Sequence, residues 1–134
     1  MNERLPKFKG QQLIAEIEKS TDGLTYRSET DAPFEPLLVD RDESKKFLDS
    51  IYKTEINETV EVSTFFDRLT TRKAWFGAKE NERAEKFAML EEILLANLCD
   101  LKLIRVGRVR IDIYVVGVDE DGNLAGIKTK AVET

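Results

Sequence analysis

The second half of the chain changes from a helical to a strand spacing of apolar residues, and this change constrains the fold more than any other feature. Residues 80–98 repeat apolar side chains every three or four positions, which predicts one long amphipathic helix. Residues 109–116 and 125–131 alternate instead, and Asp119-Glu120-Asp121-Gly122-Asn123 between them is rich in turn-forming residues. The pattern therefore predicts a β-hairpin that follows a long helix.

The predicted helix at 80–98 has one broad apolar face, which consists of Ala84, Phe87, Leu90, Leu94 and Leu98. Met89 and Ile93 lie off that face. Either the helix is covered on more than one side, or these two residues are apolar side chains tolerated at the surface. The sequence leaves both interpretations open.

The first two-thirds of the chain predict shorter elements. Residues 11–19 and 42–53 have helical apolar spacing, and residues 60–62 read as a short strand running into a helix with Ser63 as its N-cap. Residues 25–36 are polar and contain two prolines, so we predict a structured loop there. Residues 70–77 end in a glycine and predict a second loop, which separates two helices.

Two further strands complete the predicted sheet. Residues 34–39 form a short apolar run, and Pro36 confines it to an edge or a bulge. Residues 101–106 predict a strand before the hairpin. Helices must then cover the apolar faces of a largely antiparallel sheet, so the fold class is α/β (α+β), a layered sandwich. The length fits one domain, residues 1–134.

The composition restricts the function. Histidine is absent, which removes the most common acid/base side chain and zinc ligand, and the one cysteine, Cys99, excludes an internal disulfide. No secretory leader or membrane span is recognisable, so we expect a soluble, cytoplasmic protein with no cofactor. Neither the paired carboxylates nor the Asp119–Asn123 turn has the spacing of a catalytic or calcium site. We therefore predict that the chain is not an enzyme.

The net charge of −5 is unevenly distributed, because residues 29–61 contain ten Asp and Glu but four Lys and Arg. Such a surface repels nucleic acid and favours a basic protein partner. Trp75, the one tryptophan, lies in the predicted loop at 70–77, where it is either a core anchor or an exposed contact residue. Glu29 on its own reads as ordinary surface charge.

Several motifs occur in the order found in the nuclease A inhibitor-like family, whose founding member is cyanobacterial. The strongest is Gly122-Asn123-Leu124-Ala125-Gly126-Ile127, which continues through Thr129-Lys130-Ala131-Val132-Glu133-Thr134. Supporting matches are Ser20 to Leu24, Ser28-Glu29 with Pro33-Phe34-Glu35, Phe65-Phe66, Thr70-Thr71, Trp75 and Asp112-Ile113-Tyr114-Val115. The chain resembles that family over nearly its whole length.

The resemblance implies a three-layer α-β-α sandwich of the PR-1-like kind. It also implies a partner, a sugar-non-specific metal-dependent nuclease of the ββα-metal type, bound as a 1:1 heterodimer by an inhibitor that is a monomer when free. By analogy, Thr134 at the C-terminus reaches the catalytic divalent metal of the nuclease and is a metal ligand only in the complex. Glu29 and Trp75 correspond to the family's main contact residues.

One position departs from the family pattern, because Ala74 stands where an aspartate precedes the tryptophan. The alternative function is a non-inhibitory protein- or ligand-binding module of the same fold.

Overall fold

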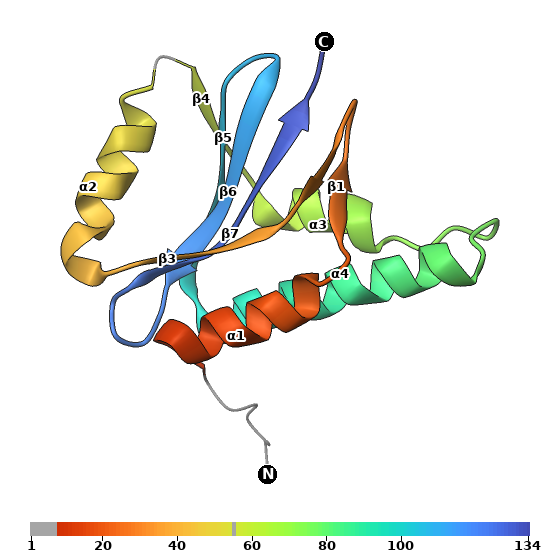
Figure 1. Ribbon diagram of the computed structural model, residues 1–134, viewed down its shortest axis with the longest axis horizontal. Coiled ribbons are helices and arrows are strands. Elements are labelled where there is room, and N and C mark those ends of the chain that lie inside the picture. Colours follow the sequence, from red (N-terminus) through yellow and green to blue (C-terminus); the bar gives the residue numbers. More distant parts are fainter. Residues whose placement is uncertain (1–7, 55) are drawn as a thin grey trace.

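The computed structural model describes residues 8–54 and 56–134, which form four helices and seven strands (Figure 1). In chain order these are α1 (Gly10–Thr21), β1 (Thr25–Arg27), β2 (Asp31–Pro33), β3 (Glu35–Val39), α2 (Arg41–Tyr52), β4 (Asn57–Val60), α3 (Val62–Thr70), α4 (Ala78–Asn97), β5 (Cys99–Val106), β6 (Arg110–Val118) and β7 (Leu124–Val132). The fold is mixed α+β, as the sequence predicted. None of the helices within these residues is long and apolar enough to cross a membrane.

Five strands form one antiparallel sheet in the order β3-β7-β6-β5-β4. The predicted hairpin is confirmed, because β6 and β7 pair from Arg110 opposite Val132 to Val118 opposite Leu124. The predicted strand at 101–106 is β5. The strand with Pro36 is β3, and it lies at the sheet edge, where a residue without an N–H group is tolerated.

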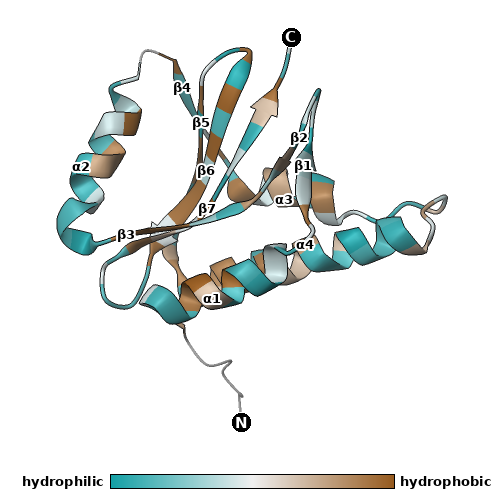
Figure 2. Ribbon diagram, in the orientation of Figure 1, coloured by the Kyte–Doolittle hydropathy of each residue, from teal (hydrophilic) through white to brown (hydrophobic). Residues whose placement is uncertain are grey.

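Helices lie on both faces of this sheet. Figure 1 shows α1, α3 and α4 against one face and α2 against the other. On the α2 side, the ring of Phe47 meets the ring of Tyr114 edge to face, with 5.9 Å between centroids. Ile51 of α2 is buried as well. Figure 2 shows that the central strands, which are covered on both faces, are largely hydrophobic, whereas α2 is mainly hydrophilic.

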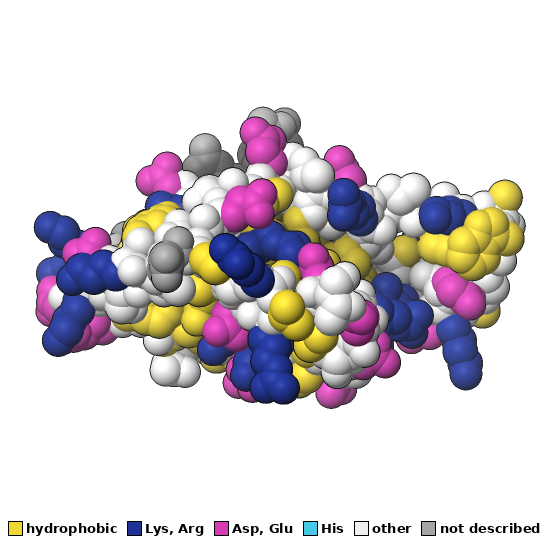
Figure 3. All heavy atoms as spheres, turned by 90° about the horizontal axis from the view of Figure 1, so that it is seen from above, with side chains coloured by type: hydrophobic (Ala, Val, Ile, Leu, Met, Phe, Trp, Pro, Cys, Tyr) yellow, Lys and Arg dark blue, Asp and Glu magenta, His cyan; other side chains and the backbone are white. Residues whose placement is uncertain are grey.

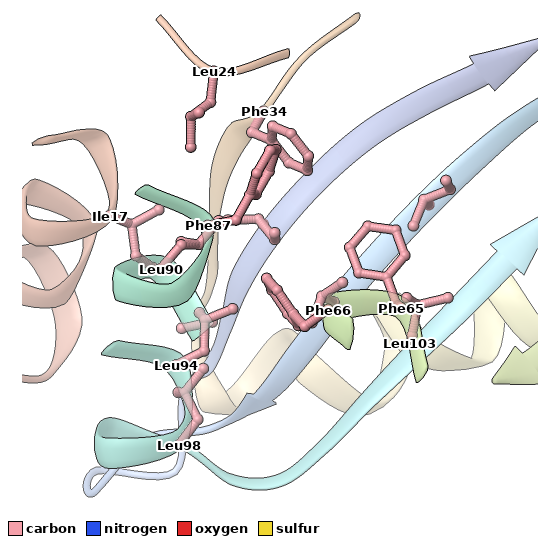
Figure 4. Close-up of a cluster of buried hydrophobic side chains, with 14 of the residues drawn as sticks. Ile17, Leu24, Phe34, Phe65, Phe66, Phe87, Leu90, Leu94, Leu98 and Leu103 are labelled. Atoms are coloured by element: carbon pink, nitrogen blue, oxygen red, sulfur yellow. The ribbon is translucent and has the colours of Figure 1, made fainter. Parts of the chain in front are cut away.

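The main core lies between the sheet and the layer of α1, α3 and α4 (Figure 4). The entire predicted face of the long helix is buried, and Phe87, Leu90 and Leu94 are fully inaccessible. The two residues off that face differ, because Met89 is 58% exposed whereas Ile93 packs partly against the core. Ile93 therefore follows the interpretation of a helix covered on more than one side, and Met89 is an apolar side chain tolerated at the surface.

The prediction of a loop over residues 25–36 is wrong. The segment contains β1 and β2, which pair as a small separate hairpin with Tyr26 opposite Ala32. Pro33 does not prevent this, because it ends a short strand that belongs to a two-stranded sheet. Tyr26 stacks on Phe65 of α3, with 5.4 Å between ring centroids. Packing on α3 thus stabilises a hairpin that its polar sequence does not predict.

The predicted N-cap at Ser63 is also wrong, because α3 begins at Val62, two residues before the start that a Ser63 cap requires. Glu61 occupies the N-cap position and makes no side-chain capping bond. The hydroxyl of Ser63 therefore lies inside the first turn, where it is not needed to start the helix.

The hydrogen bonds of the turn between β6 and β7 explain the composition of the Asp119–Asn123 motif. The carboxylate of Asp119 accepts hydrogen bonds from the backbone N–H groups of Asp121, Asn123 and Gly10. Burial alone would raise the pKa of Asp119, but these hydrogen bonds outweigh it and lower that pKa. Gly126 has φ +156°, and a β-carbon there would collide with the carbonyl oxygen of Val115. The motif thus joins the hairpin to the start of α1.

Candidate functional site

The candidate site is built around the turn between β1 and β2, which lies beside the end of β7 (Figure 1). The backbone N–H of Glu29 donates to the carbonyl oxygen of Val132 at 3.1 Å. The N–H of Val132 donates in return to the hydroxyl oxygen of Ser28 at 3.0 Å. These two bonds hold the turn against the last strand, so the side chain of Glu29 lies next to the residues that follow it.

Both residues after β7 are held in place by hydrogen bonds. The N–H of Glu133 donates to the carbonyl oxygen of Val109 at 2.9 Å, and its carboxylate accepts from Arg105 Nη2 at 2.8 Å. The N–H of Thr134 donates to Glu29 Oε2 at 2.6 Å, and its hydroxyl donates to Glu29 Oε1 at 2.7 Å. The final residue is therefore held at the surface in one orientation.

The structure thus brings together two of the three predicted site residues. Glu29 and Thr134 are both exposed. A carboxylate can accept about four hydrogen bonds in all, and Thr134 uses two of these positions on Glu29. The Glu29 carboxylate therefore keeps the capacity to accept from a further donor outside the chain.

Trp75 lies elsewhere, in the connection between α3 and α4. Its side chain is 73% exposed, so the core-anchor interpretation is wrong. The ring meets Phe76 edge to face at 4.8 Å between centroids, and Lys73 Nζ lies 5.6 Å from its centroid. Figure 1 places this connection at the far end of the molecule, well away from the chain end, and no described hydrogen bond or ring contact joins Trp75 to Glu29 or Thr134.

The charge on the site side is mixed. Figure 3 looks onto this side, and it shows basic side chains interspersed with acidic ones. The basic residues include Arg108 and Arg110, which are exposed at the turn between β5 and β6. The acidic excess of residues 29–61 does not come from α2, where Asp42, Glu43 and Asp49 are balanced by three basic residues. It is spread over the segments before and after α2, and Glu29 and Asp31 of the β1–β2 hairpin are part of it.

The β1–β2 hairpin has its own support from α4. Arg83 Nη2 donates to the carbonyl oxygen of Thr25 at 2.7 Å, and its guanidinium lies 4.7 Å from the ring centroid of Phe87. Burial lowers the pKa of Arg83, and the nearby positive charge of Arg27 lowers it further. This partly buried cation links the base of the hairpin to the core.

Sequence reasoning missed the residues that support the site, namely Ser28, Arg105 and Glu133. Their roles depend on which residues face each other across strands and turns, and that register follows from the folded sheet. Within residues 8–54 and 56–134, no group of three or more Cys, Asp or Glu side chains is arranged to hold a metal ion.

The fold and this site define a small α+β protein whose candidate site consists of turn and chain-end groups beside an antiparallel sheet. Comparison with family models assigns this protein to a family. Residues 11–134 match the family model described as nuclease A inhibitor-like protein, and the chain therefore belongs to that family. Membership confirms the resemblance found in the sequence, implies a nuclease partner, and identifies the chain as an inhibitor-family protein and not an enzyme. Comparison with curated proteins gave no match.

Proposed function

We propose that this protein, as a single domain over residues 1–134, inhibits a sugar-non-specific nuclease of the ββα-metal type by occupying its active-site cleft. In this proposal the C-terminal threonine, Thr134, lies near the catalytic divalent metal of the nuclease, and the complex is a 1:1 heterodimer. Helices on both faces of the sheet support a three-layer α-β-α sandwich of the PR-1-like kind as the scaffold. The observation that carries the proposal is the pair of hydrogen bonds between Glu29 and Thr134.

The chemistry of Thr134 suits a hard divalent cation, because such ions prefer oxygen ligands. A terminal carboxylate offers two oxygens. The hydroxyl directs its proton to Glu29, so the lone pairs of its oxygen stay available to a metal. Thr134 would thus present oxygens where a substrate phosphate otherwise binds, which makes the inhibition a form of substrate mimicry.

Glu29 has two tasks in this mechanism. It holds the backbone and hydroxyl of Thr134 before the partner arrives, so little conformational entropy is lost on binding. Its remaining acceptor positions would pair with an Arg or Lys of the nuclease cleft. Trp75 would contribute a separate apolar contact, because an exposed ring on a loop buries a large area at a small entropic cost.

The direct test is a titration against a purified ββα-metal nuclease with magnesium, followed by the cleavage of double-stranded DNA. We expect cleavage to fall linearly and to stop at one inhibitor per nuclease. Unchanged cleavage at a large molar excess over several such nucleases would contradict inhibition and favour a non-inhibitory binding module.

A further inference from the structure

A second feature of the molecule is a pocket between the β1–β2 hairpin, α3 and the β4–β5 edge of the sheet. Its volume is about 450 Å³, within the range of roughly 300–1,000 Å³ that small-molecule sites occupy. It is lined by Tyr26, Arg27, Glu58, Val60, Thr64, Phe65, Arg68, Leu69, Leu103 and Arg105. Figure 3 shows basic side chains near the centre of this side of the molecule.

Three arginines line this one pocket in a chain whose net charge is −5. Arg105 is paired with Glu133. The guanidinium groups of Arg27 and Arg68 make no ion pair or hydrogen bond with any part of the chain that the structure describes. Like charges around a cavity repel each other, and a bound anion removes that cost.

The charge balance of the lining indicates what kind of anion fits. Because Glu133 neutralises Arg105, the other two arginines and Glu58 leave the pocket a net charge of +1, so an anion fits it and a cation does not. A phosphate monoester carries a charge of about −1.5 to −2 near neutral pH, since its second pKa is about 6. Guanidinium groups also match phosphate oxygens geometrically, because they donate two parallel hydrogen bonds.

One wall of the pocket is apolar. The ring of Tyr26 stacks on that of Phe65 with an interplanar angle of 19°, and Val60, Leu69 and Leu103 extend the apolar surface. A bare phosphate ion would leave this wall exposed to water. A ligand that also carries a planar ring would cover it, because aromatic faces bind flat rings by stacking.

We propose that this pocket binds a small phosphate monoester with a planar ring, such as a nucleoside monophosphate. Arg27 and Arg68 hold the phosphate, and the ring lies against Tyr26. Neither Glu29 nor Thr134 lines the pocket, although Arg105 of its lining pairs with Glu133, and the occupancy of the pocket is measured on the inhibitor alone. Its failure would therefore leave the proposed nuclease inhibition untouched.

The test is isothermal titration calorimetry of the full chain at low salt with four probes. These are adenosine 5′-monophosphate, adenosine, inorganic phosphate and a single-stranded trinucleotide with a 5′-terminal phosphate. We expect saturable 1:1 binding of the monophosphate, at least fivefold tighter than inorganic phosphate, and no measurable binding of adenosine. The trinucleotide should bind more weakly than the monophosphate, because its additional phosphates meet an acidic protein.

Variants assign the binding to the pocket. Arg27→Gln and Arg68→Gln should each weaken monophosphate binding about tenfold, the usual size of a lost charged hydrogen bond. The matched control is Arg72→Gln, because Arg72 pairs with Glu85 outside the pocket. All three arginines are exposed, so the melting temperature should hold.

Four results would overturn the proposal. They are no saturable heat with the monophosphate, equal binding of inorganic phosphate and monophosphate, tighter binding of the trinucleotide, and unchanged binding after both pocket arginines are replaced.

Discussion

The carboxylate of Glu29 accepts two hydrogen bonds from Thr134, one from its backbone N–H and one from its hydroxyl, at 2.6 and 2.7 Å. The two residues are 105 positions apart in the chain. The first lies in the β1–β2 turn and the second follows the last strand, so the contact exists only once the small hairpin has packed beside β7. This relationship places a loop carboxylate and the final residue in one site.

Replacing Glu29 with glutamine tests this contact. The amide keeps one acceptor but loses the charge and one bond to Thr134, so both the positioning of the tail and the proposed pairing with a cleft cation weaken. Truncating one member of such a charged pair costs roughly 2–5 kcal/mol, so we expect inhibition to weaken about thirtyfold or more. The measurement is the inhibition constant against the partner nuclease.

The control for this variant is Glu120→Gln, an equal charge change in the exposed β6–β7 turn at the other end of the sheet. It should leave inhibition within twofold of the parent. Equal inhibition by the Glu29 variant and its control would remove Glu29 from the site.

Trp75 gives a prediction that separates binding from stability. Since the ring is 73% exposed, Trp75→Ala should change the unfolding free energy by less than about 0.5 kcal/mol. Loss of an aromatic contact residue at an interface costs about 2 kcal/mol or more, so affinity should fall about thirtyfold. Leu95→Ala is the matched control, because Leu95 is a 60% exposed apolar residue on α4. Undiminished affinity for the Trp75 variant would place the α3–α4 connection outside the interface.

Arg105 tests whether the tail has to be held. Its side chain is 24% exposed and pairs with Glu133, which precedes Thr134. Arg105→Gln should cost less than about 1 kcal/mol of stability, because partly exposed ion pairs contribute little. It should nevertheless raise the dissociation rate of the nuclease complex several-fold, since a looser tail is ordered again at each binding event. An unchanged dissociation rate would show that the hydrogen bonds to Glu29 are sufficient to position Thr134 without Arg105.

The carboxylate of Asp119 gives a stability prediction that depends on pH. Its pKa in the folded protein is lowered, so the folded state prefers the charged form more than the unfolded chain does. Its contribution is therefore complete above about pH 4, the ordinary pKa of aspartate, and is lost as the pH falls through the lower folded value. Asp119→Ala should lower the unfolding free energy by about 2–3 kcal/mol at pH 7.

Chemical denaturation at pH 7 and at pH 3 measures this difference, which should shrink at the lower pH. Asp121→Ala is the control, because Asp121 lies in the same turn and its side chain makes only an exposed ion pair, with Lys9. A loss for Asp119→Ala that is the same at both pH values would contradict a role for the charged carboxylate.

The elements that could be predicted from the sequence are those with a long, regular apolar period. The helix at 80–98 and the hairpin that follows each bury a continuous face, so the pattern of side chains reports the structure directly. The β1–β2 hairpin could not be found in this way, because its strands have three residues each and it is held by tertiary contacts such as the stacking of Tyr26 on Phe65. Tertiary contacts outweigh local preference there.

The site was predictable only in part, and for a similar reason. Thr134, Glu29 and Trp75 were named through the family resemblance, and the exposure of Trp75 agrees with a contact residue. That Glu29 touches Thr134 could not be predicted, because it depends on the packing of the small hairpin beside β7. The roles of Arg105 and Ser28 depend on the same register.

The central claim is that the end of the chain occupies the place of a substrate phosphate near the nuclease metal. The most direct measurement compares the parent with a variant that has one glycine added after Thr134, by inhibition titration and by thermal melting. The added residue moves the carboxylate away but leaves the core and the side chain of Thr134 intact. We expect the inhibition constant to rise at least a hundredfold while the melting temperature stays within about 1 °C, as for a surface change. Inhibition equal to that of the parent would contradict the account.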